Sequence, residues 1–397
     1  MSSEKSLTPQ IRFKGFTEAW EQRKVNELCK IGTGKSNTQD QVPNGFYPFY
    51  IRSDVPVRSN KYLYDCEAVI TIGDGNIGKV FHYVNGKFDL HQRCYKMTEF
   101  QDIWGKYFYY FFSTKFYNRA VKMTAKATVD SVRLEMISEM DVSKPIQINE
   151  QRKISDLFTT IDNLITLHQR KLDALKKIKS ALLEKMFPKN GSNVPEIRFT
   201  GFTEAWEQRK LGELMEVTSV RRVHQDEWTT QGVRFLRARD LVAYANNTEI
   251  ELPLYISKEL YEKYTAQSGK VEIGDLLVTG VGTIGVPWLV ETPSPVYFKD
   301  GNIIWFKNKN AIYGKYFYYA FTSAFIQNFI KESAGTGTVG TYTIDTGKKT
   351  PIYIPPTFEQ HKIASAMKRF DSLITLHQRK LDALKKIKSA LLEKMFV

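Results

Sequence analysis

The sequence predicts an α+β protein of two globular domains joined by two long helices, which pair as an antiparallel coiled coil with pseudo-two-fold symmetry. Three observations support this prediction. The chain holds two tandem copies of one design, each copy ends in a long amphipathic helical pattern, and short β-rich runs precede each helix. With 397 residues, the chain also exceeds the ~250–300 residues at which one hydrophobic core stops growing.

The internal repeat is the strongest signal in the chain. Residues 9–28 and 195–214 agree at 16 of 20 positions, and residues 164–187 and 373–396 are the same 24 residues, LITLHQRKLDALKKIKSALLEKMF. The first pair is offset by 186 positions and the second by 209, so the second half carries 23 additional residues between its repeated ends. Both halves are therefore expected to share one fold with different surface residues.

The repeated tail predicts a long helix in each half. Asn149 is the predicted cap of the first helix, and Thr357 with Gln360 is the predicted capping box of the second. About 37 residues at 1.5 Å each give a helix of ~55 Å, too long to lie over one small domain. Apolar residues recur mostly every three or four positions along the first copy, at Ile154, Phe158, Ile161, Leu164, Leu167, Leu172, Leu175, Ile178, Leu182 and Met186.

The identical second helix is the nearest partner of suitable shape. Two matching apolar stripes can pair antiparallel in a self-complementary way. A strict heptad through Leu175 and Leu182 also places His168, Lys171 and Lys185 at core-like positions, so the expected seam is imperfect. Each 24-residue copy has six Lys or Arg against two Asp or Glu, and the two copies supply +8 of the formal net charge of +14.

These patterns divide the chain into five segments. The predicted boundaries are 1–147 for the first domain, 148–187 for the first helix, 188–194 for a linker, 195–355 for the second domain and 356–397 for the second helix. Within the domains, GKYFYYFF from residue 105 onward predicts a helix to about Lys122, with its aromatic face in the core rather than stacked on bases. The expected strands include residues 68–72, 80–83, 275–279 and 296–298.

Composition narrows the class of partner. Lys plus Arg is 57 and Asp plus Glu is 43, which favours an anionic polymer such as nucleic acid. Three cysteines without a CxxC pair argue against a disulfide framework or a thiolate metal site. The first residues lack the apolar region of a secretory signal, and no run of ~18 apolar residues occurs, so we expect a cytoplasmic protein.

Several motifs that suggest catalysis or nucleotide binding have structural explanations. GTGKS at 32–36 lacks the earlier glycine of a phosphate loop, since position 29 is Cys29. The GxGxxG patterns at 73–78 and 280–285 precede strand-like rather than helical residues, which predicts β-hairpin turns. PP at 355–356 lacks the flanking residues with which an adenine methyltransferase grips a flipped base, and the six histidines show no tight ligand spacing. The sequence therefore predicts neither catalytic nor metal-binding residues.

The candidate base-reading residues are polar side chains in the divergent parts. Arg is suited to guanine, and Asn or Gln to adenine. Taken singly, each fits a solvated surface residue better than a base contact. The candidates are Lys35, Asn37, Arg52, Arg58, Asn76 and Arg93 in the first half, and Arg221, Arg222, Gln225, Arg237, Arg239 and Thr283 in the second.

The arrangement resembles the specificity subunit of type I restriction-modification enzymes. The resemblance covers essentially the whole chain and includes the IRFxGFTEAWEQRK segment at the start of each half, with DGNIG at 74–78 and TIG at 283–285 as weaker support. It implies that each variable part is a target recognition domain reading half of an asymmetric, bipartite site in double-stranded DNA. It also implies that the helices dock two modification (methyltransferase) subunits, and that restriction (translocase/endonuclease) subunits join them. No cofactor is expected on this chain, whereas SAM, ATP and Mg are expected on the partner subunits.

Two alternatives remain open. A self-contained restriction enzyme would show nuclease or methylation activity as the purified chain, with metal or SAM. A coiled-coil protein scaffold without DNA specificity would show no sequence preference and a shallow dependence of binding on salt.

Overall fold

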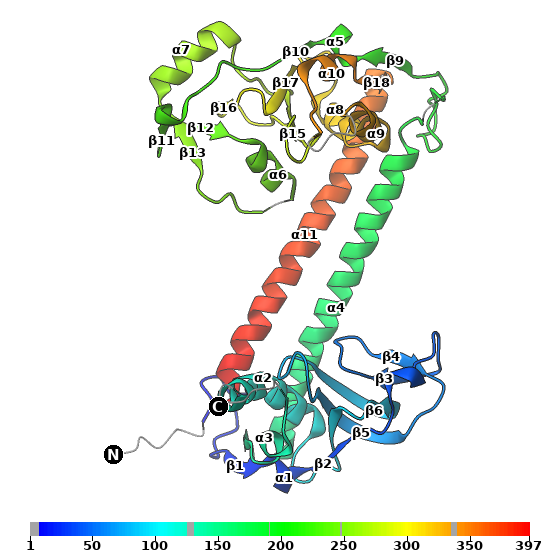
Figure 1. Ribbon diagram of the computed structural model, residues 1–397, viewed down its shortest axis with the longest axis vertical. Coiled ribbons are helices and arrows are strands. Elements are labelled where there is room, and N and C mark those ends of the chain that lie inside the picture. Colours follow the sequence, from blue (N-terminus) through cyan, green and yellow to red (C-terminus); the bar gives the residue numbers. More distant parts are fainter. Residues whose placement is uncertain (1–7, 125–130, 190, 247, 335–339) are drawn as a thin grey trace. The chain divides into compact units, whose positions relative to one another are not determined.

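The computed structural model describes residues 8–124, 131–189, 191–246, 248–334 and 340–397. The chain forms two compact units (Figure 1). The first unit contains residues 1–170 and 378–397, and the second contains residues 171–377. Each unit thus combines one predicted domain with part of both long helices.

The first unit is built on a six-stranded sheet with the strand order β2-β7-β5-β6-β3-β4. Neighbouring strands are antiparallel, except that β3 runs parallel to β6. The predicted runs at 68–72 and 80–83 lie in or beside β5 and β6, which are joined by the first GxGxxG turn as expected. The strands are β2 Lys30–Thr33, β3 Tyr47–Tyr50, β4 Val57–Ser59, β5 Tyr64–Ile72, β6 Phe81–Leu90 and β7 Cys94–Thr98.

The remaining elements of the first unit cover this sheet and lead into the long helix. Strand β1 (Glu21–Lys24) pairs with β8 (Asp141–Lys144) in a separate two-stranded sheet. The helices are α1 Val25–Leu28, η1 Thr38–Asp40, α2 Gly105–Thr124, α3 Leu134–Ser138 and α4 Ile148–Lys185, of which α4 continues into the second unit.

Alternation along β5 gives the first unit two cores. Val69 points to one face, where it meets the aromatic side chains of α2, while Ala68 and Ile70 point to the other face. The expectation that the aromatic stretch is core is confirmed, because Tyr107, Phe108, Phe111 and Phe112 are buried between the sheet and α4. Burying these rings supplies much of the apolar area that stabilises the unit.

The second unit has the same plan with its large sheet divided. One four-stranded sheet has the order β10-β17-β14-β15 and the other β11-β13-β12-β16. The stretch corresponding to β6 is interrupted between β15 and β16 by residues 290–295, which include Pro293 and Pro295. Proline cannot donate to a sheet ladder, so it ends the strand there. The strands are β9 Glu207–Lys210, β10 Glu216–Thr218, β11 Trp228–Thr229, β12 Val233–Leu236, β13 Leu254–Ile256, β14 Leu276–Thr279, β15 Pro287–Leu289, β16 Val296–Phe298, β17 Ile303–Lys307 and β18 Pro351–Ile354.

The additional residues of the second half build two helices that the first unit lacks at the matching connections. Helix α6 joins β12 to β13, and α7 joins β13 to β14, where the first unit has short loops at 51–56 and 60–63. The helices of this unit are α5 Leu211–Leu214, η2 Gln225–Glu227, α6 Ala238–Asn246, α7 Lys258–Ser268, α8 Gly314–Phe321, α9 Ala324–Ser333, α10 Ile344–Lys349 and α11 Thr357–Met395, of which α11 ends in the first unit.

The two long helices run antiparallel within each unit. In the first unit, Phe158 of α4 stacks on Phe396, which follows α11, and Asp162 forms a 2.6 Å ion pair with Lys388. In the second unit, Lys179 of α4 pairs with Asp371 of α11 in the same way. Tyr110 and Tyr319 donate hydrogen bonds to these two aspartates, so the duplicated sequence makes duplicated contacts. The predicted α+β class, with two globular domains and paired antiparallel helices, is confirmed.

Three details of the predicted helices are wrong. Asn149 lies inside α4, which begins at Ile148, and is therefore not its cap. Thr357 is the first residue of α11, and Gln360 turns inward to donate to Pro355 O at 2.9 Å, so no capping box forms. The least exposed helix positions follow the heptad through Leu172, Leu175 and Lys179, which leaves Lys171 and Lys185 exposed rather than in the seam.

Candidate nucleic-acid interface

Four connections of the first unit meet at one edge of its large sheet. These connections follow β2, follow β3, join β5 to β6 and join β6 to β7. Lys35, Asn37, Arg52, Asn76 and Arg93 all lie on them and are exposed, so the structure brings together five residues that the sequence scatters. Backbone hydrogen bonds of 2.8–2.9 Å link the connections: Gln92 N–H to Ser36 O, His91 N–H to Tyr50 O, and Gly73 N–H to Arg93 O.

Asp74 joins two of these candidates. Its carboxylate accepts hydrogen bonds from Arg52 Nη1 at 3.1 Å and from Arg93 Nη1 at 2.7 Å. Burial raises the pKa of the Asp74 carboxyl, but the hydrogen bonds from Arg93 and Arg52 lower this pKa by more than burial raises it. The net shift is therefore downward, and the carboxyl is ionised at neutral pH. We call Arg52, Asp74 and Arg93 the Arg-Asp-Arg cluster.

Other polar groups lie around this cluster. Asn37 Oδ1 accepts a hydrogen bond from Gln92, and both side chains are exposed. Arg58 lies on the edge strand β4, and no hydrogen bond among the described residues links its side chain to the cluster. Sequence reasoning missed Asp74 and Gln92. Asp74 lies within the first GxGxxG pattern and Gln92 precedes Arg93. Only the folded chain shows what these two side chains contact.

The second unit distributes its candidates differently. Arg221 lies over the ring of Tyr264 and donates to Gln267, so it packs on α7. Arg222 and Gln225 are exposed nearby in sequence, and Arg239 is exposed on α6. Thr283 is exposed in the β14–β15 turn, which confirms the second GxGxxG pattern as a hairpin turn.

Arg237 has an internal role in the second unit. Its guanidinium donates to Asp240 at 3.0 and 3.1 Å and to the carbonyl of Leu252 at 3.0 Å, and only 15% of its side chain is exposed. Leu252 itself has a left-handed backbone conformation, and its side chain is 79% exposed. Most of the donors of Arg237 are therefore engaged within the protein, although its predicted contact with DNA is untested.

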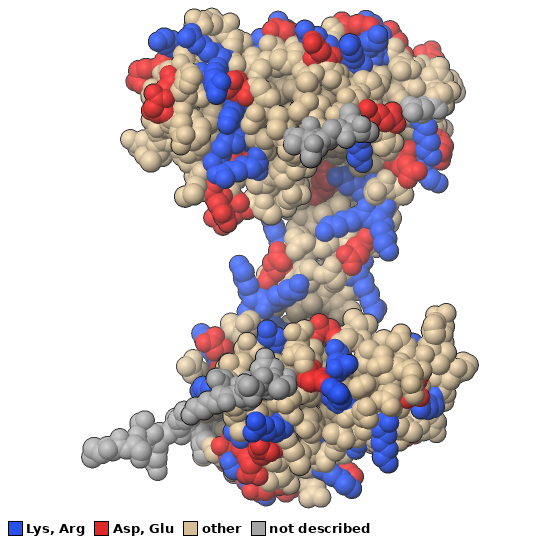
Figure 2. All heavy atoms as spheres, viewed as in Figure 1, with Lys and Arg blue, Asp and Glu red and all other residues tan. Residues whose placement is uncertain are grey.

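Some apolar side chains of the long helices are exposed to solvent, although the sequence pattern placed them in the apolar stripe of the helix. In the first unit, Leu164 and Leu167 of α4 and Ile387 of α11 are 39–50% exposed. In the second unit, the equivalent Leu373, Leu376 and Ile178 are 42–48% exposed. Lys and Arg side chains project from the same helices (Figure 2). Each unit thus exposes the same three apolar side chains of its two long helices, and we call each set of three a helix patch.

Two of the three cysteines are buried. Burial raises the pKa of the Cys29 and Cys94 thiols to about 12, so neither is a thiolate at neutral pH. Among the residues that the structure describes, no three His, Cys, Asp or Glu side chains gather as metal ligands do. None of the described helices has the length and apolar character needed to cross a membrane.

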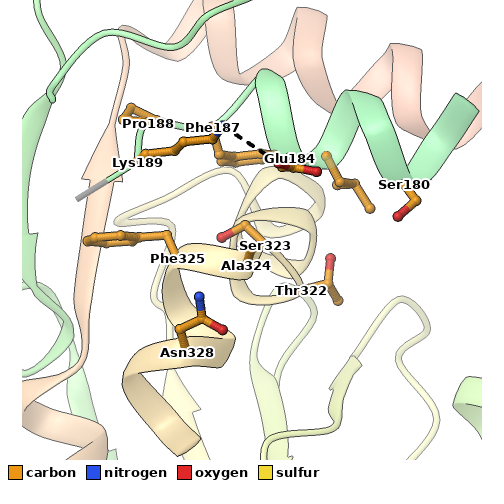
Figure 3. Close-up of a pocket in the computed structure, with 11 residues that line it drawn as sticks. Ser180, Glu184, Phe187, Pro188, Lys189, Thr322, Ser323, Ala324, Phe325 and Asn328 are labelled. Atoms are coloured by element: carbon orange, nitrogen blue, oxygen red, sulfur yellow. Dashed lines mark ion pairs between the residues drawn. The ribbon is translucent and has the colours of Figure 1, made fainter. Parts of the chain in front are cut away.

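A pocket of about 540 Å³ in the second unit lies apart from the candidate residues. Its lining comes from the end of α4 and from the α8–α9 junction (Figure 3). Glu184 and Lys189 form an ion pair of 3.6 Å at its wall. At the position matching Ala324, the first unit has Lys115, whose ammonium donates to Phe396 O. The smaller side chain in the second unit helps to leave this space open.

Comparison with known proteins gives a consistent result. Residues 17–177 and 203–386 match the model of the "Type I restriction modification DNA specificity domain". The chain is 23% identical to the MjaVIII specificity subunit of Methanocaldococcus jannaschii, over 94% of this chain and 91% of that one. It is 31% identical to a putative type I specificity subunit of Haemophilus influenzae over 41% of this chain and 40% of that one.

Solved structures share the fold. The S subunit of a type I restriction-modification system from M. genitalium superposes with a TM-score of 0.70, covering 98% of this chain and 99% of that one at 17% identity. A chain from a study of complex assembly and conformational transition of the type I R-M system gives a TM-score of 0.54 at 13% identity, with 95% and 97% covered.

Proposed function

The chain belongs to the type I restriction-modification DNA specificity family, and from this premise we propose that each unit reads one half of an asymmetric, bipartite site in double-stranded DNA. The observation that carries this proposal is the edge of the first unit, where connections from four strands gather exposed Arg, Lys and Asn side chains. Such side chains donate to base edges and to phosphates. The two units carry different residues at matching positions, so their half-sites should differ.

We further propose that the helix patches dock two modification (methyltransferase) subunits and that restriction subunits join this complex. Identical patches favour two copies of one partner, because each displays the same apolar residues in the same sequence context. SAM, ATP and Mg would be bound by those partners, and the complex would act on DNA in the cytoplasm. The chain itself would bind and position DNA without catalysing a reaction.

Linking two readers through paired helices has a physical advantage. Once one unit binds, the second half-site is bound intramolecularly, so a bipartite site gains affinity without a larger interface. Each mismatched base pair would cost roughly 1–3 kcal/mol. Contacts from Lys and Arg to phosphates would supply the salt-sensitive, sequence-independent part of binding.

Exchange of one recognition domain tests this function. Replacing residues 24–145 with the corresponding segment of another specificity subunit should change one half of the methylated site and leave the other unchanged. The measurement is sequencing of methylated DNA from cells that express the exchanged chain with its partner subunits. A change in both halves, or in neither, would contradict the assignment of one half-site to each unit.

A further inference from the structure

The Arg-Asp-Arg cluster combines exposure with fixed geometry. Arg52 and Arg93 keep 45% and 62% of their side chains exposed although both contact the same carboxylate. A guanidinium has five N–H donors, and each arginine binds Asp74 through Nη1 alone. Both therefore retain donors that face away from the ion pair. Pairing with one carboxylate restricts two long side chains that would otherwise sample many rotamers.

Asp74 cancels part of the positive charge of the two arginines, which weakens their attraction for phosphates. Asp74 is ionised, so a DNA phosphate approaching either guanidinium would also approach a negative charge. The acceptors on the edge of a base carry only partial negative charge, so Asp74 repels them less than it repels a phosphate. Guanine offers O6 and N7 as adjacent acceptors in the major groove, which suit the N–H donors of arginine.

We propose that Asp74 is a positioning residue that orients Arg52 and Arg93 to read guanine in the half-site bound by the first unit. This proposal rests on the DNA-reading role proposed above. Asp74 acts through the arginines, which make the contacts with the base. Asn76 lies two residues further along the same turn and is also exposed.

The second unit provides an internal comparison. Its turn has the same glycine conformation, with positive φ at Gly282 and Gly285 as at Gly75 and Gly78. Gly280 N–H bonds to Asn302 O just as Gly73 N–H bonds to Arg93 O, so Asn302 occupies the place of Arg93. Val281 stands at the position of Asp74. At these two positions, the same backbone frame thus carries charged side chains in one unit and neutral side chains in the other.

Selection from a random duplex library tests the proposal with the full-length chain. Bound DNA is sequenced for the unaltered protein and for Asp74→Asn, Arg52→Lys and Arg93→Lys. Asp65→Asn is the matched control, since it removes the same charge from an exposed residue near the opposite end of β5. The half-site of the first unit is identified by the exchange of residues 24–145.

We expect a guanine at one position of that half-site, with a preference that Asp74→Asn weakens by about 5- to 150-fold. Sequence-independent binding should not fall, because the variant gains net positive charge. Each lysine variant should lose the same preference at an unchanged salt dependence. Asp65→Asn should keep the preference, and the half-site of the second unit should be unaltered throughout.

Guanine lacking N7 gives a test that leaves the protein unchanged. Placing 7-deazaguanine at the selected position should weaken binding of the unaltered protein and have little further effect on Asp74→Asn. If the first half-site contains no selected guanine, or if Asp74→Asn keeps the preference, the proposal is wrong while the two-reader function stands. If the unaltered chain selects no sequence at all, both are wrong.

Discussion

Replacing Phe396 with alanine is expected to lower the free energy of unfolding of the first unit by about 3–5 kcal/mol. The ring is 3% exposed and contacts Tyr107, Phe111 and Phe158 at centroid distances of 5.4–5.8 Å. Although Phe396 lies near the end of the chain, it belongs to the core of the unit that contains the first residues. Hydrogen exchange of peptides from each unit, in increasing denaturant, measures the loss.

The duplicated chain supplies the matched comparison. Phe187 is the equivalent residue and packs on Trp206 and Tyr316, so Phe187→Ala should destabilise the second unit instead. Ile387→Ala, at a position 50% exposed, should cost far less. If Phe396→Ala weakens hydrogen-exchange protection of the first unit no more than Ile387→Ala does, the packing of Phe396 in the core of the first unit would be wrong.

Replacing Leu164, Leu167 and Ile387 with glutamate should prevent binding of one of the two methyltransferase subunits that we propose as partners. A few residues at the centre of an interface each cost about 2 kcal/mol or more when truncated, and glutamate would also place charge there, so the triple variant should bind ~100-fold more weakly at that site. Glutamate is a good helix former, and these positions are exposed, so the fold should persist. Mass photometry of the chain titrated with its methyltransferase measures the number of copies bound.

A control and a second variant sharpen this prediction. Thr166→Glu, an exposed position between the two leucines but on another side of α4, should still bind two copies. Changing Leu373, Leu376 and Ile178 to glutamate should remove the other copy. If either triple variant still binds two methyltransferases with unaltered affinity, the helix patches are not the docking surfaces.

The elements with strong local patterns were predictable from the sequence. The duplicated helix repeats apolar residues over many turns, and the turns between β5 and β6 and between β14 and β15 carry glycines at positions of positive φ. Local pattern also separated the aromatic core of α2 from a base-stacking surface. These features depend on neighbours within a few residues, which a sequence displays directly.

Details that depend on distant contacts were not predictable. The side chain of Gln360 fits the pattern of a capping box, but its amide instead satisfies Pro355 O and accepts from Tyr313 N–H. Leu164 and Leu167 fit an amphipathic stripe, yet that stripe is wider than the seam between the helices. Periodicity does not distinguish a residue buried in the chain from one exposed for a partner.

In the candidate site too, the residue types were predictable from the sequence, whereas their contacts were not. Residue type alone selected Arg52 and Arg93, because arginine is suited to guanine. It did not reveal that Asp74 joins them, since the contact needs three connections to converge at one edge of the sheet. Arg237 was selected for the same reason as Arg52, but its donors are mostly engaged by Asp240 and Leu252. Burial and pairing, which the sequence does not show, separate these two arginines.

Single-molecule sequencing of methylated DNA identifies the sequence motif that each unit reads. DNA from cells with the gene intact is compared with DNA from cells in which the gene is deleted. We expect one motif to disappear on deletion, made of two unlike half-sites separated by a gap of constant length. Restoring the gene should restore that motif. Loss of an uninterrupted or palindromic motif, or no loss at all, would contradict a chain in which two different units each read one half of the site.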